Sequence, residues 1–326
     1  MIGIHGMGRI GRAVLRVALE RKIPISAIND RNDLEQIAYL LKYDSVYGTL
    51  NNYINTKEGK LIIDNQSIRF IRAMPFPNWA DFGVNIVLDC SGGGPDGNKS
   101  REHLKCGADT VIISAPANNI DQLLVMGVNE KEFLPEHKII SMASCTTNCV
   151  APIIKAIKQI SEIDFLRLNS LNAYTNSQRL VDAPHGDLRL SRAAGLNIIP
   201  SESSTKRSIE VLFPELEGRY HAQAFRVPVP CGSITTMSFT FKNDISQDVD
   251  KFHKAISGNP FIEFNSSPIV SSDIVGNPAS AIIDCPSTKI NGREVNLMAF
   301  YDNEWGYANR LLDLALYILG RQKCKA

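Results

Sequence analysis

The first thirty residues constrain the fold more than any other stretch of the chain. Residues 2–5 form an apolar strand-like run, Gly6-Met7-Gly8-Arg9-Ile10-Gly11 follows, and apolar residues recur at helical spacing over 12–21. A second apolar run at 23–28 closes a βαβ unit, and Asp30 comes soon after it. Glycines in this pattern let the backbone approach a pyrophosphate at a helix N-terminus, and the acid can hold a ribose hydroxyl. The context predicts a dinucleotide site, although a glycine turn can also serve only to pack a strand on a helix.

The alternation of strands and helices continues up to residue 142, with one interruption. Residues 33–42 have a helical pattern, whereas short alternating runs at 48–72 indicate inserted hairpins. Further strands of a parallel sheet are indicated at 84–90, 110–115, 123–128 and 138–142. Two of these strands end near Ser91 and Ser114. Because ligands of open α/β sheets bind outside the carboxyl ends of strands, both turns are candidate cofactor contacts.

A second feature is the stretch Ser144-Cys145-Thr146-Thr147-Asn148-Cys149, where a strand-like run ends and an apolar helical stripe begins. A cysteine on the first turn of a helix lies beside unpaired backbone N–H groups and the positive end of the helix dipole, which favours its thiolate. Cys145 therefore has the setting of a nucleophile. Small Ser, Thr and Cys residues also serve as helix caps and buried fillers, so the spacing alone leaves a structural role open.

The pattern changes after this helix. Long β-rich stretches lie at 165–175, 220–230, 233–242 and 293–301, and helices are indicated at 203–212 and 247–257. These stretches predict an α+β domain with a mostly antiparallel sheet and helices on one face. The weakly periodic segment 179–200 is a long loop of the kind that usually binds something. Since the amphipathic helix 309–319 most simply packs on the first domain, we expect one domain of residues 1–144 with 308–326 and another of 145–307.

Composition limits the partners. Of the 326 residues, 44% are apolar and 21% charged, and the net charge of +1 gives no argument for nucleic acid or an anionic membrane as the main partner. The chain begins with a strand-like run rather than a signal peptide and lacks an apolar run of about 18 residues, so we expect a cytoplasmic protein. The seven scattered cysteines resemble free thiols, and no Cys or His pair at zinc-site spacing follows Cys145 and Cys149, so we expect no metal.

Six motifs follow one another along the chain. They are Gly-Met-Gly-Arg-Ile-Gly-Arg at 6–12, Ser-Cys-Thr-Thr-Asn-Cys at 144–149, Ala-Tyr-Thr-Asn-Ser-Gln at 173–178, Asn-Ile-Ile-Pro at 197–200, Arg-Val-Pro at 226–228 and Tyr-Asp-Asn-Glu-Trp-Gly-Tyr at 301–307. Together, in this order, they resemble the phosphorylating glyceraldehyde-3-phosphate dehydrogenase family. The resemblance implies a Rossmann-type parallel sheet domain, an α+β catalytic domain with a mostly antiparallel sheet, and a homotetramer. It also implies oxidation of a sugar-phosphate aldehyde by NAD through a cysteine thioester, which inorganic phosphate releases as an acyl phosphate.

The resemblance assigns roles to residues of this chain by position. Cys145 is the expected nucleophile, and Ser144, Thr146, Thr175, Arg192 and Arg226 are expected to grip two phosphate groups. The expected cofactor contacts are Gly6, Gly8, Arg9, Ile10, Gly11, Asp30, Ser91, Ser114, Asn303 and Tyr307. Asp30 would repel a 2′-phosphate and favours NAD, whereas Arg31 and Ala183-Pro184 leave NADP open.

Asn172 is the main departure from the family. There the corresponding residue is a histidine, which raises the thiolate population and takes the hydroxyl proton as hydride leaves. An amide has no titrating proton near neutral pH, and losing a positioned general base costs on the order of 10²–10⁴ in rate. Three explanations compete: a deliberate substitution that traps a complex, a natural paralogue that binds without efficient turnover, or replacement of the base by another histidine such as His185.

A second departure concerns the acyl acceptor. After Asn-Ile-Ile-Pro the family usually places a Thr-Gly pair that donates to phosphate, and this chain has Ser203-Ser204. The related erythrose-4-phosphate dehydrogenases also lack that pair and favour water over phosphate. The sequence thus leaves a phosphorylating triose enzyme, a hydrolytic tetrose enzyme and a catalytically weak NAD-binding protein as alternatives.

Overall fold

The computed structural model describes residues 1–72, 76–92 and 95–323, and the chain divides into two compact units. The first unit takes residues 1–124 and 129–143 together with the C-terminal segment from residue 308. The second unit takes residues 125–128 and 144–307. Over the described residues, no helix is long and apolar enough to cross a bilayer.

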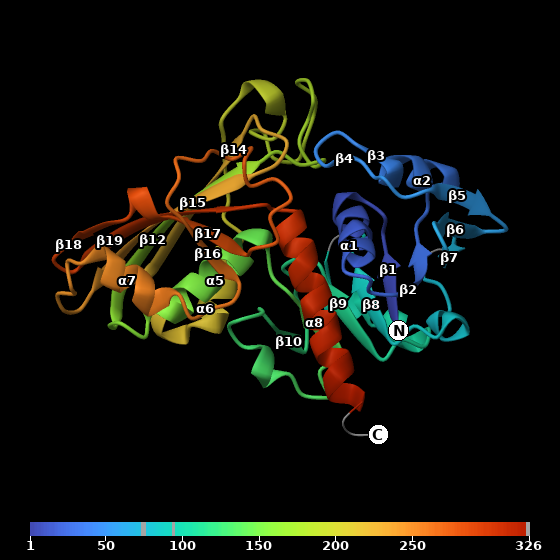
Figure 1. Cartoon of the computed structure of the whole chain (residues 1–326), viewed down its shortest axis with the longest axis horizontal. Helices are drawn as coiled ribbons and strands as arrows, with labels where there is room; N and C mark the ends of the chain where they lie inside the picture. Colours follow the sequence, from blue (N-terminus) through green and yellow to red (C-terminus); the bar gives the residue numbers. More distant parts are fainter. Residues whose placement is uncertain (73–75, 93–94, 324–326) are drawn as a thin grey trace. The chain divides into compact units, whose positions relative to one another are not determined.

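The first unit is built on a sheet that has nine strands within the described residues, in the order β10-β11-β9-β8-β1-β2-β7-β6-β5 (Figure 1). Their bounds are β1 Ile2–His5, β2 Ile25–Asn29, β5 Ile54–Lys57, β6 Lys60–Ile63, β7 Gln66–Ile71, β8 Ile86–Asp89, β9 Thr110–Ile113, β10 Gln122–Leu123 and β11 Ile139–Ser141. Strand β1 pairs in parallel with β2 and with β8, and β9 pairs in parallel with β8 and β11. Every residue of β1 and β9 is buried, which is typical of parallel strands covered on both faces.

The helices of the first unit cover this sheet. They are α1 Arg9–Glu20, α2 Leu34–Lys42, α3 Gly97–Ser100, α4 Glu102–Lys105 and α8 Trp305–Lys323, whose first residues belong to the second unit. Arg21, which caps the end of α1, forms an ion pair with Asp313 of α8 at 2.6 Å. The two short strands β3 Tyr43–Asp44 and β4 Gly48–Thr49 form a separate ribbon. The parallel, doubly covered sheet confirms the predicted α/β class of the first half.

Glycines fix the turn between β1 and α1. A side chain on Gly6, whose φ is +90°, would lie 2.5 Å from the Cα of Ser91 at the end of β8. A side chain on Gly11 would lie 2.0 Å from the carbonyl oxygen of Gly6. By contrast, nothing lies within 4 Å of the position that a side chain on Gly8 would take. The turn is therefore packed tightly on its inner side and open at Gly8, where the backbone can be approached.

The second unit is a mixed, mostly antiparallel sheet of eight strands within the described residues. Its strands are β12 Ile163–Ala173, β13 Ile199–Ser201, β14 Tyr220–Val227, β15 Ser233–Phe241, β16 Ile262–Asn265, β17 Ala281–Asp284, β18 Lys289–Asn291 and β19 Glu294–Tyr301. Helices α5 Cys145–Ile157, α6 Thr205–Leu212 and α7 Val249–Ile256 gather on one face of this sheet (Figure 1). The alternating burial along β15 matches a sheet with one face packed on helices. The predicted α+β class of the second half is confirmed.

Two expectations about individual elements were wrong, and a third was confirmed. The strand expected at 123–128 is only Gln122–Leu123, because the chain leaves the sheet there and turns at Gly127, whose φ is +79°. The hairpins expected at 48–72 are confirmed, since β5 and β6 pair antiparallel, as do β6 and β7, and β7 also pairs in parallel with β2. Helix α1 begins at Arg9 rather than at residue 12, inside the glycine turn.

Gly11→Ala tests the tight side of this turn. Its methyl group would collide with the Gly6 carbonyl, so the free energy of unfolding should fall by roughly 2–4 kcal/mol. Urea denaturation measures this change. Gly8→Ala is the matched control and should change stability by less than about 1 kcal/mol, since its methyl group meets no atom. Equal losses in the two variants would contradict the packing argument.

Candidate active site

The start of helix α5 is set by its local sequence. Ser144 is the N-cap, and its hydroxyl accepts the backbone N–H of Thr147 at 3.1 Å. Ala143 precedes it with a φ of +55°, a left-handed conformation that is strained for a residue with a side chain. Cys145 is then the first residue of the helix, beside backbone N–H groups that the helix itself cannot pair. The predicted nucleophile thus occupies the expected helix start.

Opposing effects act on the pKa of the Cys145 thiol. Burial raises its pKa, because a thiolate loses solvation there. The pKa is lowered again by the guanidinium of Arg226, then by the hydroxyl and the backbone N–H of Thr146, and last by the backbone N–H of Cys145. Burial is the largest of these effects, so the group is mainly a thiol at neutral pH.

Asn172 lies at the end of β12 in a buried hydrogen-bond network. Its side-chain oxygen accepts the hydroxyl of Tyr301 at 2.8 Å and that of Thr146 at 3.3 Å. Its amide N–H group donates to the hydroxyl of Ser170 at 3.0 Å. The two hydroxyl oxygens of Thr146 and Tyr301 are themselves 2.8 Å apart. Both ends of the Asn172 amide are therefore engaged by neighbours.

Sequence reasoning missed Tyr301 and Ser170 of this network, and Tyr301 is the more informative of the two. It stands at the end of β19 and is 2% exposed. Burial raises the pKa of its phenol well above the ordinary value, so it stays protonated and acts as a donor to Asn172. The signal was present in the motif at 301–307, but a tyrosine in a strand more often packs than hydrogen-bonds an active-site residue.

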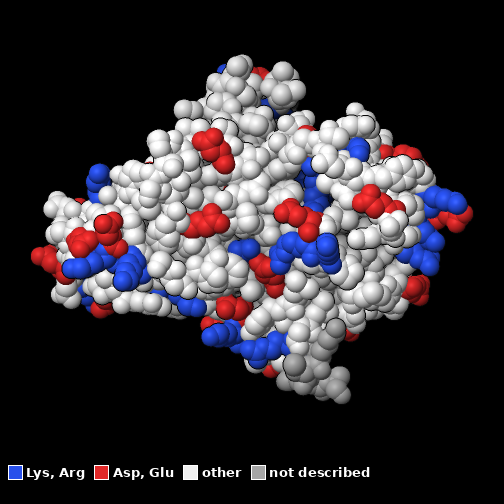
Figure 2. Space-filling model, viewed as in Figure 1, with Lys and Arg blue, Asp and Glu red and all other residues white. Residues whose placement is uncertain are grey.

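Arg226 is the cation that faces this network. It lies on β14 directly beside Asn172, because the register of the parallel pair β12 and β14 aligns these two residues. Its guanidinium also donates to the carbonyl of Ala173 at 3.2 Å. On the face drawn in Figure 2, acidic and basic side chains are intermingled, as a net charge of +1 leads one to expect. Attraction for an anion here is therefore local and comes from Arg226.

Three of the other residues expected to grip phosphate have a local partner. Thr175 shares a hydrogen bond of 2.8 Å with Ser177, and both are exposed. Arg192 forms an ion pair of 2.9 Å with Asp182 in the exposed loop. Ser203 shares a hydrogen bond of 2.8 Å with Thr205, and exposed Ser204 precedes α6 without capping it through its side chain. The structure thus groups Cys145, Thr146, Asn172 and Arg226, and holds Thr175, Arg192 and Ser203 in contacts of their own.

His185 does not join the Asn172 network. Its ring nitrogen Nδ1 accepts the backbone N–H of Asp187 at 2.9 Å within the exposed loop. The structure therefore places this alternative base in a local turn of the loop.

The residues of the first unit that were expected to bind the cofactor converge on the end of β1. Asp30 accepts the backbone N–H of Met7 at 2.6 Å, which draws the acid to the glycine turn. Gly8 is exposed, and Ile10 is half-buried in the first turn of α1. Ser91 and Ser114 line one recess at the carboxyl ends of β1, β8 and β9. An open helix start, an acid and two hydroxyl groups fit the requirements of a dinucleotide.

The Arg9 side chain contacts the segment of β3 and β4 instead of contributing to the recess. Its guanidinium pairs with Asp44 at 2.6 Å and lies over the ring of Tyr47, 5.7 Å from the ring centre. Its backbone N–H in the first turn of α1 is the group that can face an anion. The two remaining expected cofactor residues belong to the second unit, where the side-chain oxygen of Asn303 accepts the backbone N–H of Gly232 and Tyr307 is buried.

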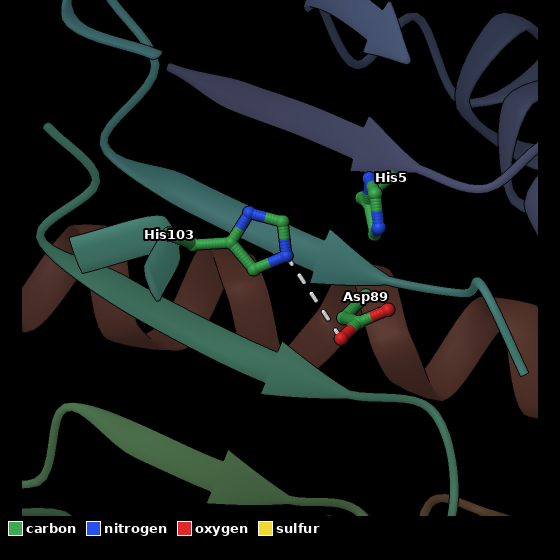
Figure 3. A group of neighbouring side chains, drawn as sticks. All are labelled: His5, Asp89 and His103. Carbon is green, nitrogen blue, oxygen red and sulfur yellow. Dashed lines mark ion pairs between the residues drawn. The ribbon is translucent and has the colours of Figure 1, made fainter. Parts of the chain in front are cut away.

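Two histidines and an aspartate form a separate cluster in the first unit (Figure 3). His5, Asp89 and His103 have potential metal-ligand atoms within 4.8 Å of one another. The indole N–H of Trp79 donates to Nδ1 of His103 at 2.8 Å, so the neutral His103 ring carries its proton on Nε2, where a metal would need a lone pair. That nitrogen lies 3.9 Å from Asp89, whereas ligands of one zinc ion are about 3.3–3.5 Å apart. The cluster therefore does not fit a metal ion.

The His103 ring makes stability depend on pH. Burial, followed by the neighbouring His5, lowers its pKa to about 3. The unfolded chain takes up this proton near pH 6.5, whereas the folded chain does not. The free energy of unfolding is therefore unaffected by His103 above that pH and falls as the pH decreases from 6.5 toward 3. We expect His103→Gln to reduce the loss of unfolding free energy between pH 7 and pH 5 by about 2 kcal/mol. Urea denaturation of both proteins at the two pH values measures it, and parallel losses would contradict the assignment.

Comparison with known proteins agrees with this geometry. Residues 1–96 match the family model described as the NAD binding domain of glyceraldehyde 3-phosphate dehydrogenase, and residues 144–303 match its C-terminal domain. The chain is 42% identical to glyceraldehyde-3-phosphate dehydrogenase 2 of Streptomyces arenae and 41% identical to glyceraldehyde-3-phosphate dehydrogenase 1 of Streptomyces avermitilis. Each of these alignments covers 97% of this chain and 98% of the relative.

A more distant relative gives the same result. The chain is 36% identical to glyceraldehyde-3-phosphate dehydrogenase 2 of Bacillus subtilis, over 99% of this chain and 97% of that protein. Both halves of the chain therefore match one kind of enzyme over nearly the full length. The chain belongs to the glyceraldehyde-3-phosphate dehydrogenase family of NAD-dependent dehydrogenases.

Proposed function

We propose that this chain catalyses the phosphorylating oxidation of glyceraldehyde 3-phosphate with NAD, slowly, through a thioester on Cys145. The observation that carries the proposal is the position of Cys145 on the first turn of α5, with its thiol influenced by Arg226 and Thr146. Attack on the aldehyde carbon forms a thiohemiacetal, and oxidation converts it to the thioester. NAD, when bound, supplies the acceptor for the hydride. Inorganic phosphate then releases the acyl group as an acyl phosphate.

Slow turnover follows from Asn172. Its amide is neutral, and its oxygen already accepts hydrogen bonds from Tyr301 and Thr146. Neither Asn172 nor the protonated Tyr301 can take a proton from the reacting hydroxyl near neutral pH. Water has to take it instead, which costs on the order of 10²–10⁴ in rate relative to a positioned base.

The residues that hold the reactants are proposed by position in the motifs. Cations and hydroxyl groups for the two phosphates come from Arg226, Thr146, Ser144, Thr175, Arg192, Ser203 and Ser204. The turn at Gly6–Gly11, Asp30, Ser91 and Ser114 hold NAD in a domain of residues 1–144 with 308–326. Asn303 and Tyr307 contribute from the catalytic domain of residues 145–307.

An erythrose-4-phosphate dehydrogenase is the second candidate. The Ser203 hydroxyl shares its hydrogen bond with Thr205, which is in turn bonded to Tyr220 at 2.7 Å. A hydroxyl committed in this way is a weaker phosphate donor, which favours water as the acyl acceptor. A third candidate is a paralogue that binds NAD and turns over little.

Assembly as a homotetramer is also proposed. Leu180, Leu188 and Leu196 in the long loop are more than four-fifths exposed, and Val181 and Ile198 are about two-thirds exposed. Apolar side chains gathered on one loop favour burial against another chain. Because the proposed chemistry needs a reduced thiol, a cytoplasmic location suits it.

Asn172→His tests the proposed function. The variant should form NADH from glyceraldehyde 3-phosphate and inorganic phosphate at least about a hundredfold faster than the parent chain, since it gains a base. Initial rates at 340 nm with and without phosphate give the comparison. Asn169→His, the same substitution three residues earlier on β12, is the matched control and should leave the rate unchanged.

The outcomes of these rate measurements distinguish the three candidate functions. Phosphate-dependent turnover of the triose supports the proposal, and phosphate-independent turnover of erythrose 4-phosphate supports the second candidate. If neither the parent chain nor Asn172→His turns over while both bind NAD, the chain is a binding protein and the proposal fails.

The proposed assembly predicts a particle of four times the 36.0 kDa chain mass in sedimentation equilibrium. Leu188→Asp places a charge on the exposed apolar loop and should shift the mass toward smaller species. Leu316→Asp, at a half-exposed position of α8 outside this loop, is the control and should keep the parent mass. A parent chain that sediments as a monomer would rule out the tetramer.

A further inference from the structure

The strand order of the first unit places two carboxylates on opposite sides of the glycine turn. Strand β1, which leads into this turn, pairs with β2 on one side and with β8 on the other. Asp30 directly follows β2, and Asp89 is the last residue of β8. Neighbouring strands are about 4.8 Å apart, so both acids lie near the turn at the carboxyl ends of the strands. Asp30 has the expected role of a ribose-binding acid, and Asp89 has the equivalent position on the other side of the turn.

Asp89 lines the same recess as Ser91 and Ser114. This recess has about 360 Å³ of unfilled space, part of which is open to solvent. Pockets for small molecules usually have roughly 300–1,000 Å³. The recess therefore suits one nucleoside-sized group rather than a whole dinucleotide.

The Asp89 carboxylate fixes the direction of the Ser91 hydroxyl group. Its Oδ1 atom accepts the hydroxyl of Ser91 at 2.7 Å and the backbone N–H of the same residue at 3.2 Å. Its Oδ2 atom accepts the hydroxyl of Ser100 at 3.0 Å. Because a carboxylate has only lone pairs, the Ser91 hydroxyl must donate to it and can offer a ligand only its own lone pairs. Asp89 and Ser91 therefore present hydrogen-bond acceptors to a ligand.

The groups around Asp89 leave its negative charge in place. His103 lies 3.9 Å from its Oδ2 atom on the buried side (Figure 3). Burial lowers the pKa of His103 to about 3, so near pH 7 the ring supplies an N–H dipole but no positive charge. Lys99 also lines the recess, but it is exposed, and solvent screens its charge. A negatively charged pair of acceptors attracts the hydrogens of hydroxyl groups and repels phosphate oxygens.

The order of these groups along the sheet matches the order of groups in a dinucleotide, where a pyrophosphate lies between two riboses. The open helix start at the glycine turn suits the pyrophosphate. Asp30, on the β2 side, suits the adenosine ribose, whose 2′-position such an acid reads. The acceptors of Asp89 and Ser91, on the β8 side, are then in the place of the second ribose.

We propose that Asp89, together with the Ser91 hydroxyl that it orients, accepts the hydroxyl groups of the nicotinamide ribose of NAD. The inference rests on the proposed function, because it takes Ser91 as a cofactor contact. It makes Asp89 a residue that selects for a hydroxyl-bearing sugar and against phosphate on this side of the turn.

Calorimetric titration with NAD⁺ tests the proposal without any turnover. Asp89→Asn keeps the size of the side chain, but it removes the charge and replaces one acceptor with an N–H donor. The dissociation constant for NAD⁺ should therefore rise at least about tenfold. Asp109→Asn is the matched control, since Asp109 is an exposed acid just before β9, at the end of that strand remote from the recess. It should bind NAD⁺ as the parent chain does.

Deoxy analogues of NAD⁺ identify the group that Asp89 contacts. For the parent chain, removal of the 2′- or the 3′-hydroxyl of the nicotinamide ribose should raise the dissociation constant about tenfold. In Asp89→Asn the same removals should have little further effect, because the acceptor is already lost. Analogues that lack a hydroxyl of the adenosine ribose should retain the full effect of Asp89→Asn. If that effect is equal for all analogues, or disappears only for those of the adenosine ribose, the inference is wrong.

A second variant covers the case in which Asp89→Asn does not fold. Ser91→Ala removes the other acceptor and leaves the carboxylate, so it should weaken NAD⁺ binding several-fold and weaken binding of the nicotinamide-ribose analogues less. Equal losses for NAD⁺ and for these analogues would contradict the inference.

Binding of NAD⁺ to the parent chain distinguishes the two levels of failure. If calorimetry detects no binding, the proposed function fails together with the inference. If the parent chain and Asp89→Asn bind NAD⁺ equally, the inference fails and the proposed function stands.

Discussion

The hydrogen bond from the Thr147 backbone to the Ser144 hydroxyl determines where α5 begins, and the rest of the site depends on that position. One residue of shift along the helix would turn the Cys145 side chain by about 100° and remove it from the unpaired N–H groups. The left-handed backbone at Ala143 adds strain just before this point. A strained junction persists only where surrounding structure enforces it, and here buried residues on both sides do so.

The hydrogen bonds of the Asn172 amide fix this network in one arrangement. A buried amide must satisfy both its donor and its acceptor atoms, and Ser170, Tyr301 and Thr146 do this. The same bonds that stabilise the amide also remove any lone pair that could take a proton from a substrate. A histidine in this position could bind one proton reversibly, whereas the satisfied amide binds none. Stability of the network and its use as a base are therefore opposed in this chain.

Most features of the fold that depend on local sequence patterns could be predicted from the sequence. The glycine turn, the start of α5 and the two fold classes follow from spacing, because each depends on a few neighbouring residues. The strand expected at 123–128 failed because apolar periodicity does not show where a chain leaves its sheet. Tyr301 was missed for a related reason: its bond to Asn172 joins β19 to β12, strands far apart in sequence. The register of β12 and β14, which brings Arg226 beside Asn172, is equally invisible in a linear pattern.

That register explains how a nearly neutral protein can offset part of the cost of forming a buried thiolate. The net charge of +1 supplies no general field, so the stabilisation must come from groups within a few ångströms. Arg226 is one such group, and burial makes its effect larger by reducing screening while it also penalises the thiolate. The two consequences of burial oppose each other, and the penalty on the thiolate is the larger one. The Cys145 thiol therefore stays mainly protonated at neutral pH, and Arg226 offsets only part of the cost of burying its thiolate.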